Sequence, residues 1–236
     1  MSEISAVRRE LAKYASKKRA KISQGFFKTG VGEYGEGDQF IGVSVPDTRL
    51  VARQFTTLAR AQIRKLLQSK IHEERMVAIE ILCFQYAKAI DAEKKKIVTF
   101  YLANRACINN WDLVDGSAPH IVGDWLIDKD RKILFELVRA KRLWDRRIAI
   151  IATYAFIKKN DFADTLRLAE FLLGDDEDLI HKAVGWMLRE VGNRDRMALE
   201  RFLKKYYKTM PRTMLRYAIE KFPKTLYKKY LAGTVG

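Results

Sequence analysis

Residues 75–90 read RMVAIEILCFQYAKAI. The apolar side chains of this stretch recur at spacings of three and four residues, which is the period of an α-helix with a buried face. Residues 146–159, RRIAIIATYAFIKK, show the same pattern, as do nearly all segments of comparable length after position 46. The whole chain contains only four prolines, the residue that most strongly interrupts helices. The sequence therefore predicts an all-α protein.

Helix start and stop signals divide this periodic region into short segments. They lie at Asp91, Asn109, Asn110, Asp128, Asp161, Gly174, Gly192, Asn193 and Pro211. Helices of this length with short connections stack as antiparallel pairs. We expect a single domain over residues 1–236, with an N-terminal helix and a glycine-rich loop in residues 1–46 and helical repeats in residues 47–236.

A repeat with a period near 35 residues runs through the helical region. Similar segments are found at successive spacings of 36, 36, 35 and 34 residues, starting at Arg75, Trp111, Arg147, Lys182 and Arg216. HEAT-type arrays have two helices per repeat and a period of roughly 40 residues. We therefore expect an α-solenoid of HEAT-like antiparallel helix pairs, an armadillo-like superhelix whose repeated positions line a concave basic groove. The alternative is that these five residues are ordinary surface positions near helix starts.

The charge balance points to a polyanionic partner. The chain has 45 Lys plus Arg against 29 Asp plus Glu, a formal net charge of +16 and an isoelectric point near 9.8. Such an excess attracts phosphates, and nucleic acid is the leading candidate. A membrane surface is disfavoured because the basic residues are spread along the chain instead of forming one amphipathic segment. Most individual basic clusters are expected to be solvated helix faces.

Other compositional features exclude several classes of protein. Cys83, Cys107 and the three histidines form no disulfide framework and no metal-binding spacing. The N-terminus has no signal-peptide core, and no stretch is apolar enough to span a membrane. We expect a cytoplasmic monomer without a metal or a cofactor, since an open solenoid of this size needs no partner subunit.

Residues 24–46, QGFFKTGVGEYGEGDQFIGVSVP, hold six of the thirteen glycines. The motif GVGEYG formally matches the dinucleotide-binding pattern GxGxxG. No predicted strand precedes it and no predicted helix follows it, and Glu33, Glu36 and Asp38 would repel a pyrophosphate. The segment is predicted to be an ordered loop, anchored by the aromatic side chains Phe26, Phe27, Tyr34 and Phe40.

The acidic stretch NNWDLVDG, residues 109–116, is unusual in so basic a chain. Asn109 or Asn110 is a suitable helix N-cap, and Asp112 would lie in the first turn, where the helix dipole favours negative charge. Asp115 has no such explanation. It follows Trp111 by one turn on the same face, which the repeat aligns with Arg147, Lys182 and Trp186, and further out with Arg75 and Arg216.

Simpler interpretations of these residues exist. The tryptophans could pack in the core, which is the preferred interpretation for Trp125 and Trp144, and Asp115 could be a salt-bridge partner of Arg147. A groove that only binds phosphates, however, has no use for a carboxylate. Asp115 between two indoles can stabilise the developing cation of glycosidic bond cleavage and orient the attacking water. A base that is already cationic through alkylation needs no general acid, which fits the lack of a nearby His or Glu candidate.

The chain resembles the HEAT-like DNA alkylation repair glycosylases (AlkD-like) over nearly its whole length. The resemblance rests on FFKTGVGEYGEGDQFIGVSVPD, HEERMVAIEIL, NNWDLVDGSAPHIVG, LWDRRIAII, HKAVGWMLREVG and PRTMLRYAIEKFP. It implies a site formed by Trp111, Asp115, Arg147 and Trp186. It also implies a contribution from one aromatic residue near the N-terminus, Phe26 or Phe27.

The resemblance implies excision of cationic N3- and N7-alkylated purines from duplex DNA without a base-flipping pocket, unlike most glycosylases. We assign catalytic roles to Asp115, Trp111 and Trp186, and DNA-binding roles to Arg147, Lys182, Arg75, Arg216 and Phe27. The enzyme would be cytoplasmic and associated with the bacterial nucleoid when bound to DNA. The alternative function is that of a non-catalytic HEAT-repeat module that binds nucleic acid.

Overall fold

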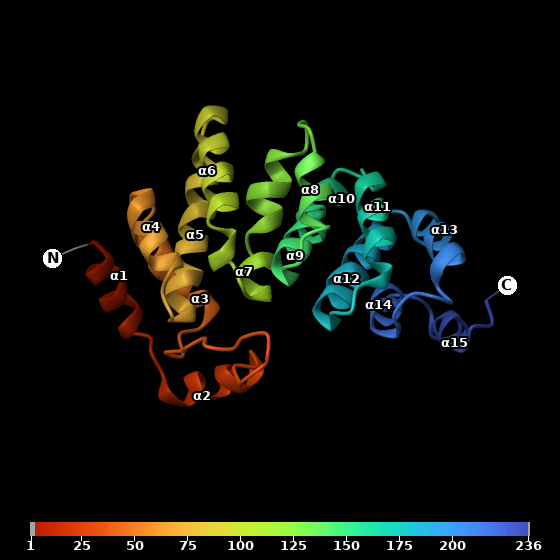
Figure 1. The fold of residues 1–236 in the computed structure, drawn as a ribbon, viewed down its shortest axis with the longest axis horizontal. Helices are drawn as coiled ribbons and strands as arrows, with labels where there is room; N and C mark the ends of the chain where they lie inside the picture. Colours follow the sequence, from red (N-terminus) through yellow and green to blue (C-terminus); the bar gives the residue numbers. More distant parts are fainter. Residues whose placement is uncertain (1–2, 236) are drawn as a thin grey trace. The chain divides into compact units, whose positions relative to one another are not determined.

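The computed structural model describes residues 3–235, and the regular secondary structure of these residues is helical (Figure 1). An isolated parallel bridge between Gln39 and Ile71 adds a local backbone link. The predicted all-α class is therefore confirmed. The chain divides into two compact units, Met1–Ser117 and Ala118–Gly236, called here the N-terminal and C-terminal units. The grouping of both into one domain stays a prediction.

The N-terminal unit is organised around one long helix, α5. Its helices are α1 (Glu3–Ala12), α2 (Lys17–Phe26), α3 (Val45–Gln54), α4 (Arg60–Leu67), α5 (His72–Lys88), α6 (Asp91–Ala103), a 3-10 turn (Arg105–Cys107) and α7 (Trp111–Asp115). Helix α5 packs against α3 and α4. Residues 72–82 of α5 are all buried, including four charged or ionisable side chains at its beginning. These side chains need partners inside the protein, because an unpaired buried charge is costly.

The region before the glycine-rich loop contains two helices, where the sequence predicted one. Ser16 separates them, since its side chain accepts a hydrogen bond from the Arg19 amide and thereby caps α2. Helix α1 buries Ile4, Val7 and Leu11, whereas α2 buries none of its residues.

The C-terminal unit is organised around α12, which packs against α9, α13 and α14. Its elements are a π-helical turn (Pro119–Gly123), α8 (Lys132–Leu137), α9 (Leu143–Ala152), α10 (Tyr154–Ile157), α11 (Ala163–Phe171), a 3-10 turn (Leu172–Gly174), α12 (Asp178–Arg194), α13 (Arg196–Tyr206), α14 (Arg212–Ala218) and α15 (Lys224–Ala232).

The predicted repeat matches the order of the helices. Its five positions fall on five separate helices, α5, α7, α9, α12 and α14. Consecutive helices are in contact as pairs, as seen for α4 with α5, α8 with α9 and α11 with α12. The period of about 35 residues thus identifies one helix per repeat.

Most of the predicted helix boundaries are confirmed, and one is wrong. Helix α6 begins at Asp91, and α7 and α14 begin directly after Asn110 and Pro211. Helix α12, however, continues through Gly192 and Asn193 and ends at Arg194. The next residue, Asp195, caps α13, because its side chain accepts a hydrogen bond from the Ala198 amide. Gly192 serves close packing, because a Cβ atom there would lie 2.4 Å from the Leu199 Cδ2 atom.

Gly123 brings two segments of the C-terminal unit into close approach. A Cβ atom at this position would lie 2.1 Å from the Ala152 carbonyl oxygen, at the end of α9. The contact is with backbone, which cannot move aside as a flexible side chain can. Gly123 is therefore required by packing at the start of the unit.

We expect Gly123→Ala to lower the free energy of unfolding by about 1–3 kcal/mol, the usual cost of overpacking a close contact. Gly174→Ala is the matched control, because a Cβ atom there would meet nothing within 4 Å. Chemical denaturation of both variants measures the difference. Equal stability of the two variants would contradict the close approach.

Candidate functional site

Helix α7 carries both residues that the sequence singled out in NNWDLVDG. Asn110 is its N-cap and accepts a hydrogen bond from the Trp111 amide through its own side chain, at 2.8 Å. Trp111 and Asp115 are the first and last residues of the helix, and both are half-buried. Burial raises the pKa of the Tyr101 phenol, and the Asp115 carboxylate makes a smaller contribution in the same direction. An indole and a carboxylate thus lie one turn apart on a short helix.

An aromatic cluster supports Trp111 from the N-terminal segment. The Phe27 ring stacks on the Trp111 indole at a centroid distance of 5.3 Å and an interplanar angle of 13°. Phe27 also stacks on Phe40 at 5.0 Å. Phe26 meets the edges of both Phe27 and Trp111, yet it is 64% exposed. Phe27 and Phe40 therefore anchor this loop. Tyr34 contributes through its hydroxyl, which donates to the Phe26 carbonyl oxygen at 3.3 Å. Phe26 is less of an anchor than expected, because most of its ring surface faces solvent.

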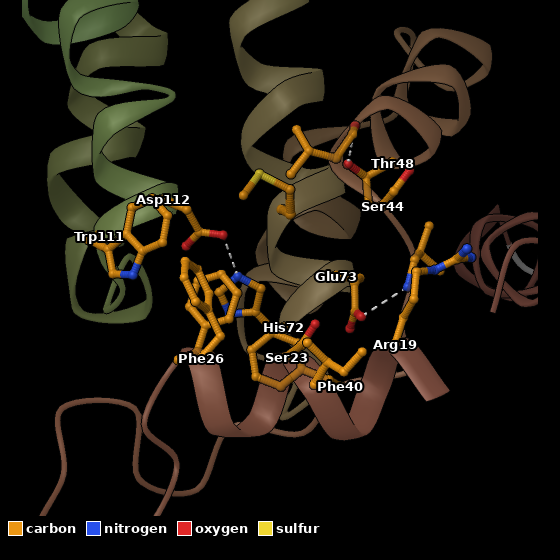
Figure 2. Close-up of a pocket in the computed structure, with 15 residues that line it drawn as sticks. Arg19, Ser23, Phe26, Phe40, Ser44, Thr48, His72, Glu73, Trp111 and Asp112 are labelled. Atoms are coloured by element: carbon orange, nitrogen blue, oxygen red, sulfur yellow. Dashed lines mark hydrogen bonds and ion pairs between the residues drawn. The ribbon is translucent and has the colours of Figure 1, made fainter. Parts of the chain in front are cut away.

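A cavity of about 420 Å³ lies beside this cluster (Figure 2). The rings of Phe26, Phe27, Phe40 and Trp111 line it together with Met76. All of its lining residues belong to the N-terminal unit. The half-buried indole of Trp111 thus borders an apolar space.

A buried charge cluster lies next to the aromatic rings. The Arg75 Nη2 atom is 2.7 Å from Asp38 Oδ1, and Asn110 Nδ2 donates to Asp38 Oδ2 at 3.2 Å. His72 lies between two carboxylates, with Nδ1 3.1 Å from Asp38 Oδ2 and Nε2 2.8 Å from Asp112 Oδ2. Figure 2 shows the dashed contact from His72 to Asp112 beside Trp111. Asp112 thus has a second role beyond the first-turn position predicted for it.

The cluster changes the proton affinity of its members. Burial acts to lower the pKa of His72, but the hydrogen bonds to Asp112 and Asp38 outweigh it and raise the pKa from 6.5 to about 8. Burial acts to raise the pKa of Asp38, but His72 and Arg75 outweigh it and hold this pKa below its usual value. The hydrogen-bonded charged forms are favoured in both groups.

Arg75 does not lie on a surface that DNA could reach, in contrast to the prediction. The side chain is 4% exposed, and its Nη1 donates to the Ser69 carbonyl oxygen at 2.9 Å. The repeat placed Arg75 on α5 correctly, but all faces of α5 are buried along this part of the helix. Arg75 is a structural partner of Asp38.

The predicted residues of the C-terminal unit lie in different environments. Arg147, on α9, is also only 4% exposed, and its Nη1 donates to the Leu179 carbonyl oxygen. Its predicted contact to phosphate stays a prediction. Lys182 and Trp186 share α12, where Lys182 Nζ is 2.7 Å from Asp178 Oδ2. Arg216, on α14, is exposed.

Trp186 is half-buried and makes defined contacts. Its Nε1–H donates to Glu190 Oε1 at 3.0 Å, and its ring lies 5.9 Å from that of Tyr154. Core packing is confirmed for Trp144, which is buried. Trp125 is half-buried, with the Lys129 ammonium 5.0 Å from its ring centroid. Trp111 and Asp115 belong to the N-terminal unit, whereas Arg147, Lys182 and Trp186 belong to the C-terminal unit. The alignment of these five residues on one face therefore stays a prediction.

A family model described as DNA alkylation repair enzyme matches residues 7–222. The chain belongs to the DNA alkylation repair enzyme family. Membership supports a role in DNA repair. Among curated proteins, no sequence matches this chain.

Solved structures with a similar fold include a predicted DNA alkylation repair enzyme from Enterococcus faecalis. It is 17% identical, with a TM-score of 0.69 over 89% of this chain and 97% of that chain. AlkD2 from Streptococcus mutans is also 17% identical, with a TM-score of 0.55 over 94% of this chain and 97% of that chain. At this identity the likeness shows the fold, and it confirms the predicted class, an α-solenoid of HEAT-like helix pairs.

Within residues 3–235, no helix is both long and apolar enough to cross a membrane. In the same residues, no group of three or more His, Cys, Asp and Glu side chains is arranged to hold a metal ion.

The burial of Arg75 leads to a stability prediction. We expect Arg75→Met to lower the free energy of unfolding by about 3–5 kcal/mol, because it removes the guanidinium partner of the buried Asp38 carboxylate. The matched control is Arg216→Met, an exposed residue at the equivalent repeat position, for which a change within about 0.5 kcal/mol is expected. Denaturation curves of the two variants provide the measurement, and similar losses in both would contradict the assignment.

Proposed function

We propose that this protein is a DNA glycosylase that hydrolyses the N-glycosidic bond of cationic alkylated purines, such as 3-methyladenine and 7-methylguanine, in duplex DNA. The observation that carries the proposal is the presence of Trp111 and Asp115 one turn apart on α7 in a member of the DNA alkylation repair enzyme family. The protein would act as a cytoplasmic monomer without a cofactor, and would be nucleoid-associated when bound to DNA.

Asp115 is the proposed catalytic residue. Its carboxylate would stabilise the positive charge that develops on the sugar and would orient the attacking water. The leaving base carries a positive charge from alkylation, so it departs as a neutral molecule without protonation. This restricts the substrate to lesions that are cationic before the reaction begins.

Trp111 would contact the sugar and backbone of the lesioned nucleotide. The stack on Phe27 covers one face of its indole and fixes the plane of the ring. Trp186 would make a similar contact from α12. Its indole N–H is occupied by Glu190, so the ring itself would provide the contact.

The exposed cations of the C-terminal unit would bind the phosphate backbone. Lys182 and Arg216 have side chains that solvent reaches, and the excess of positive charge supports attraction of DNA. Arg147 would instead hold α9 to the start of α12 through the Leu179 carbonyl oxygen. This revises the phosphate-binding role that the sequence suggested for it.

Phe26 is the better candidate than Phe27 for the N-terminal aromatic contact to DNA. Phe26 is 64% exposed and touches the edge of Trp111, whereas Phe27 is enclosed between Trp111, Phe40 and His72. An exposed ring is available to stack on a base or a sugar. Phe27 would act by supporting Trp111.

We expect Asp115→Asn to slow release of 7-methylguanine from methylated duplex DNA about 10²–10³-fold, the loss typical of one electrostatic group in the transition state. DNA affinity should be equal or higher, because a negative charge near the phosphates is removed. Chromatography of the released bases and a binding titration give the two values. Asp128→Asn, an exposed carboxylate of the C-terminal unit, is the control and should keep full activity.

Full activity of Asp115→Asn would contradict the mechanism. Absence of base release from the unaltered protein, with DNA binding retained, would favour the alternative of a non-catalytic nucleic-acid-binding module.

The two neighbouring phenylalanines separate surface contact from support. Phe26→Ala should weaken DNA binding by about 1–3 kcal/mol, the usual contribution of one stacked ring, with little change in stability. Phe27→Ala should lower the free energy of unfolding. The loss should lie near the lower end of the range of about 3–5 kcal/mol that is found for buried phenylalanines, because the Phe27 ring is half-buried. Binding titrations and denaturation curves on both variants test this pair, and the reverse pattern would contradict the assignment.

A further inference from the structure

The ring of His72 has a carboxylate at each nitrogen. Nδ1 faces Asp38 at 3.1 Å and Nε2 faces Asp112 at 2.8 Å. Ionised carboxylates only accept hydrogen bonds, and a neutral imidazole carries a single N–H, so it can donate to only one of them. Both contacts are hydrogen bonds at the same time only in the imidazolium form. A neutral ring protonated at Nε2 would instead accept from Arg75 Nη2, which lies 3.3 Å from Nδ1. The contact from Nδ1 to Asp38 is the shorter of the two, at 3.1 Å, and favours a proton on each nitrogen.

The other groups around His72 fit a buried cation. The ring is 3% exposed and lies stacked on Phe40 at 4.7 Å, with Phe27 at 5.0 Å. With Arg75 included, the cluster holds two cations and two carboxylates and is neutral. Loss of the His72 proton would leave an uncompensated negative charge in a buried place.

The elements packed around His72 carry several charged groups. The loop after α2 contributes Asp38 and α7 contributes Asp112. On α5, Arg75 Nη2 lies 3.3 Å from Nδ1, and Glu73 accepts hydrogen bonds from the Gly42 amide and the amides on either side of it. On α2, Arg19 donates to the carbonyl oxygens of Gly42 and Tyr14. Two carboxylates thus contact the ring directly and favour its protonation, whereas the Arg75 cation disfavours it.

The contacts of His72 converge on Trp111. Asp112 directly follows Trp111 in the chain, and its carboxylate is held by Nε2 of His72. Phe27 lies between the His72 ring and the Trp111 indole, in contact with both. Asp38 holds Asn110, which caps the helix. A five-residue helix has too few internal hydrogen bonds to hold itself, so these links fix the start of α7.

We propose that the imidazolium of His72 is a positioning residue that fixes the first turn of α7 and the Trp111 indole, and that its deprotonation in mildly alkaline solution releases them. The consequence for base release rests on the proposed glycosylase function. The consequence for Trp111 does not.

The sign of the pH effect follows from the raised pKa of His72. The contribution of the protonated ring is fully present below the unfolded value of 6.5 and is lost as the pH rises through the folded value of about 8. The pKa of Asp38 is held below its usual value, so its negative charge remains after the His72 proton has left.

The first experiment needs no DNA. The chain has three histidines, and His72→Gln and His120→Gln each remove one ring-proton signal and so assign it in an NMR titration. We expect the His72 signal to titrate near pH 8, together with a change in tryptophan fluorescence that disappears in Trp111→Phe. A His72 midpoint at or below 6.5, or a Trp111 fluorescence that is constant between pH 7 and 9, would overturn the proposal.

The second experiment follows base release from methylated duplex DNA against pH. The unaltered protein and the control His120→Gln should lose activity above pH 8. His72→Gln should be slower at pH 7 by about tenfold or more, since small misplacements near a reacting centre have effects of up to about 10²-fold. Its rate should not vary between pH 7 and 9, and retention of the alkaline decline in His72→Gln would overturn the proposal.

Asp112→Asn keeps an acceptor oxygen and removes one charge, so it tests the same link if His72→Gln does not fold. Its His72 midpoint and its alkaline decline in activity should both move to lower pH, and unmoved values would overturn the proposal. The unaltered protein could release no base at any pH while the Trp111 fluorescence still changes with the same midpoint as the His72 signal. In that case the proposed function fails and the positioning role stands.

Discussion

The N-terminal unit depends on the contacts of one buried carboxylate, that of Asp38. It accepts contacts from Arg75 and His72 of α5 and from Asn110 at the start of α7. These partners lie 34 to 72 residues away along the chain. A buried carboxylate is stable only when it is paired and hydrogen-bonded, so the loop that carries Asp38 must close over α5 in one arrangement. The glycine-rich segment is thereby an ordered part of the fold.

The same arrangement supports the candidate catalytic helix. Helix α7 has five residues, and its position comes from the Asn110 cap, the contact between His72 and Asp112, and the stack of Trp111 on Phe27. A carboxylate that stabilises a transition state must be held in place before the reaction, since reorganisation would consume part of its effect. The charge cluster and the aromatic cluster together give Trp111 such a fixed position, and Asp115 lies one turn further along the same helix.

Particular residues show how far sequence reasoning extended. The period of about 35 residues located the helices of Arg75, Trp111, Arg147, Lys182 and Arg216, and Asn110 was recognisable as one of two possible caps. The period did not distinguish an exposed cation, such as Arg216, from the buried Arg75 and Arg147. Periodicity describes which face a residue occupies, whereas burial depends on what packs against that face. His72 and Asp38 gave no signal, because a lone histidine and a loop aspartate acquire meaning only through partners distant in the chain.

The sequence by itself determined the helical class, the repeat and the pairing of Trp111 with Asp115 on one helix, because these follow from local spacing and capping. Tertiary structure alone decided that Phe26 is exposed while Phe27 is enclosed, that Arg75 neutralises Asp38, and that His72 joins α5 to α7. Those outcomes depend on the closure of a loop between helices, and the free energy of that closure comes from buried charges and rings that are far apart in the chain.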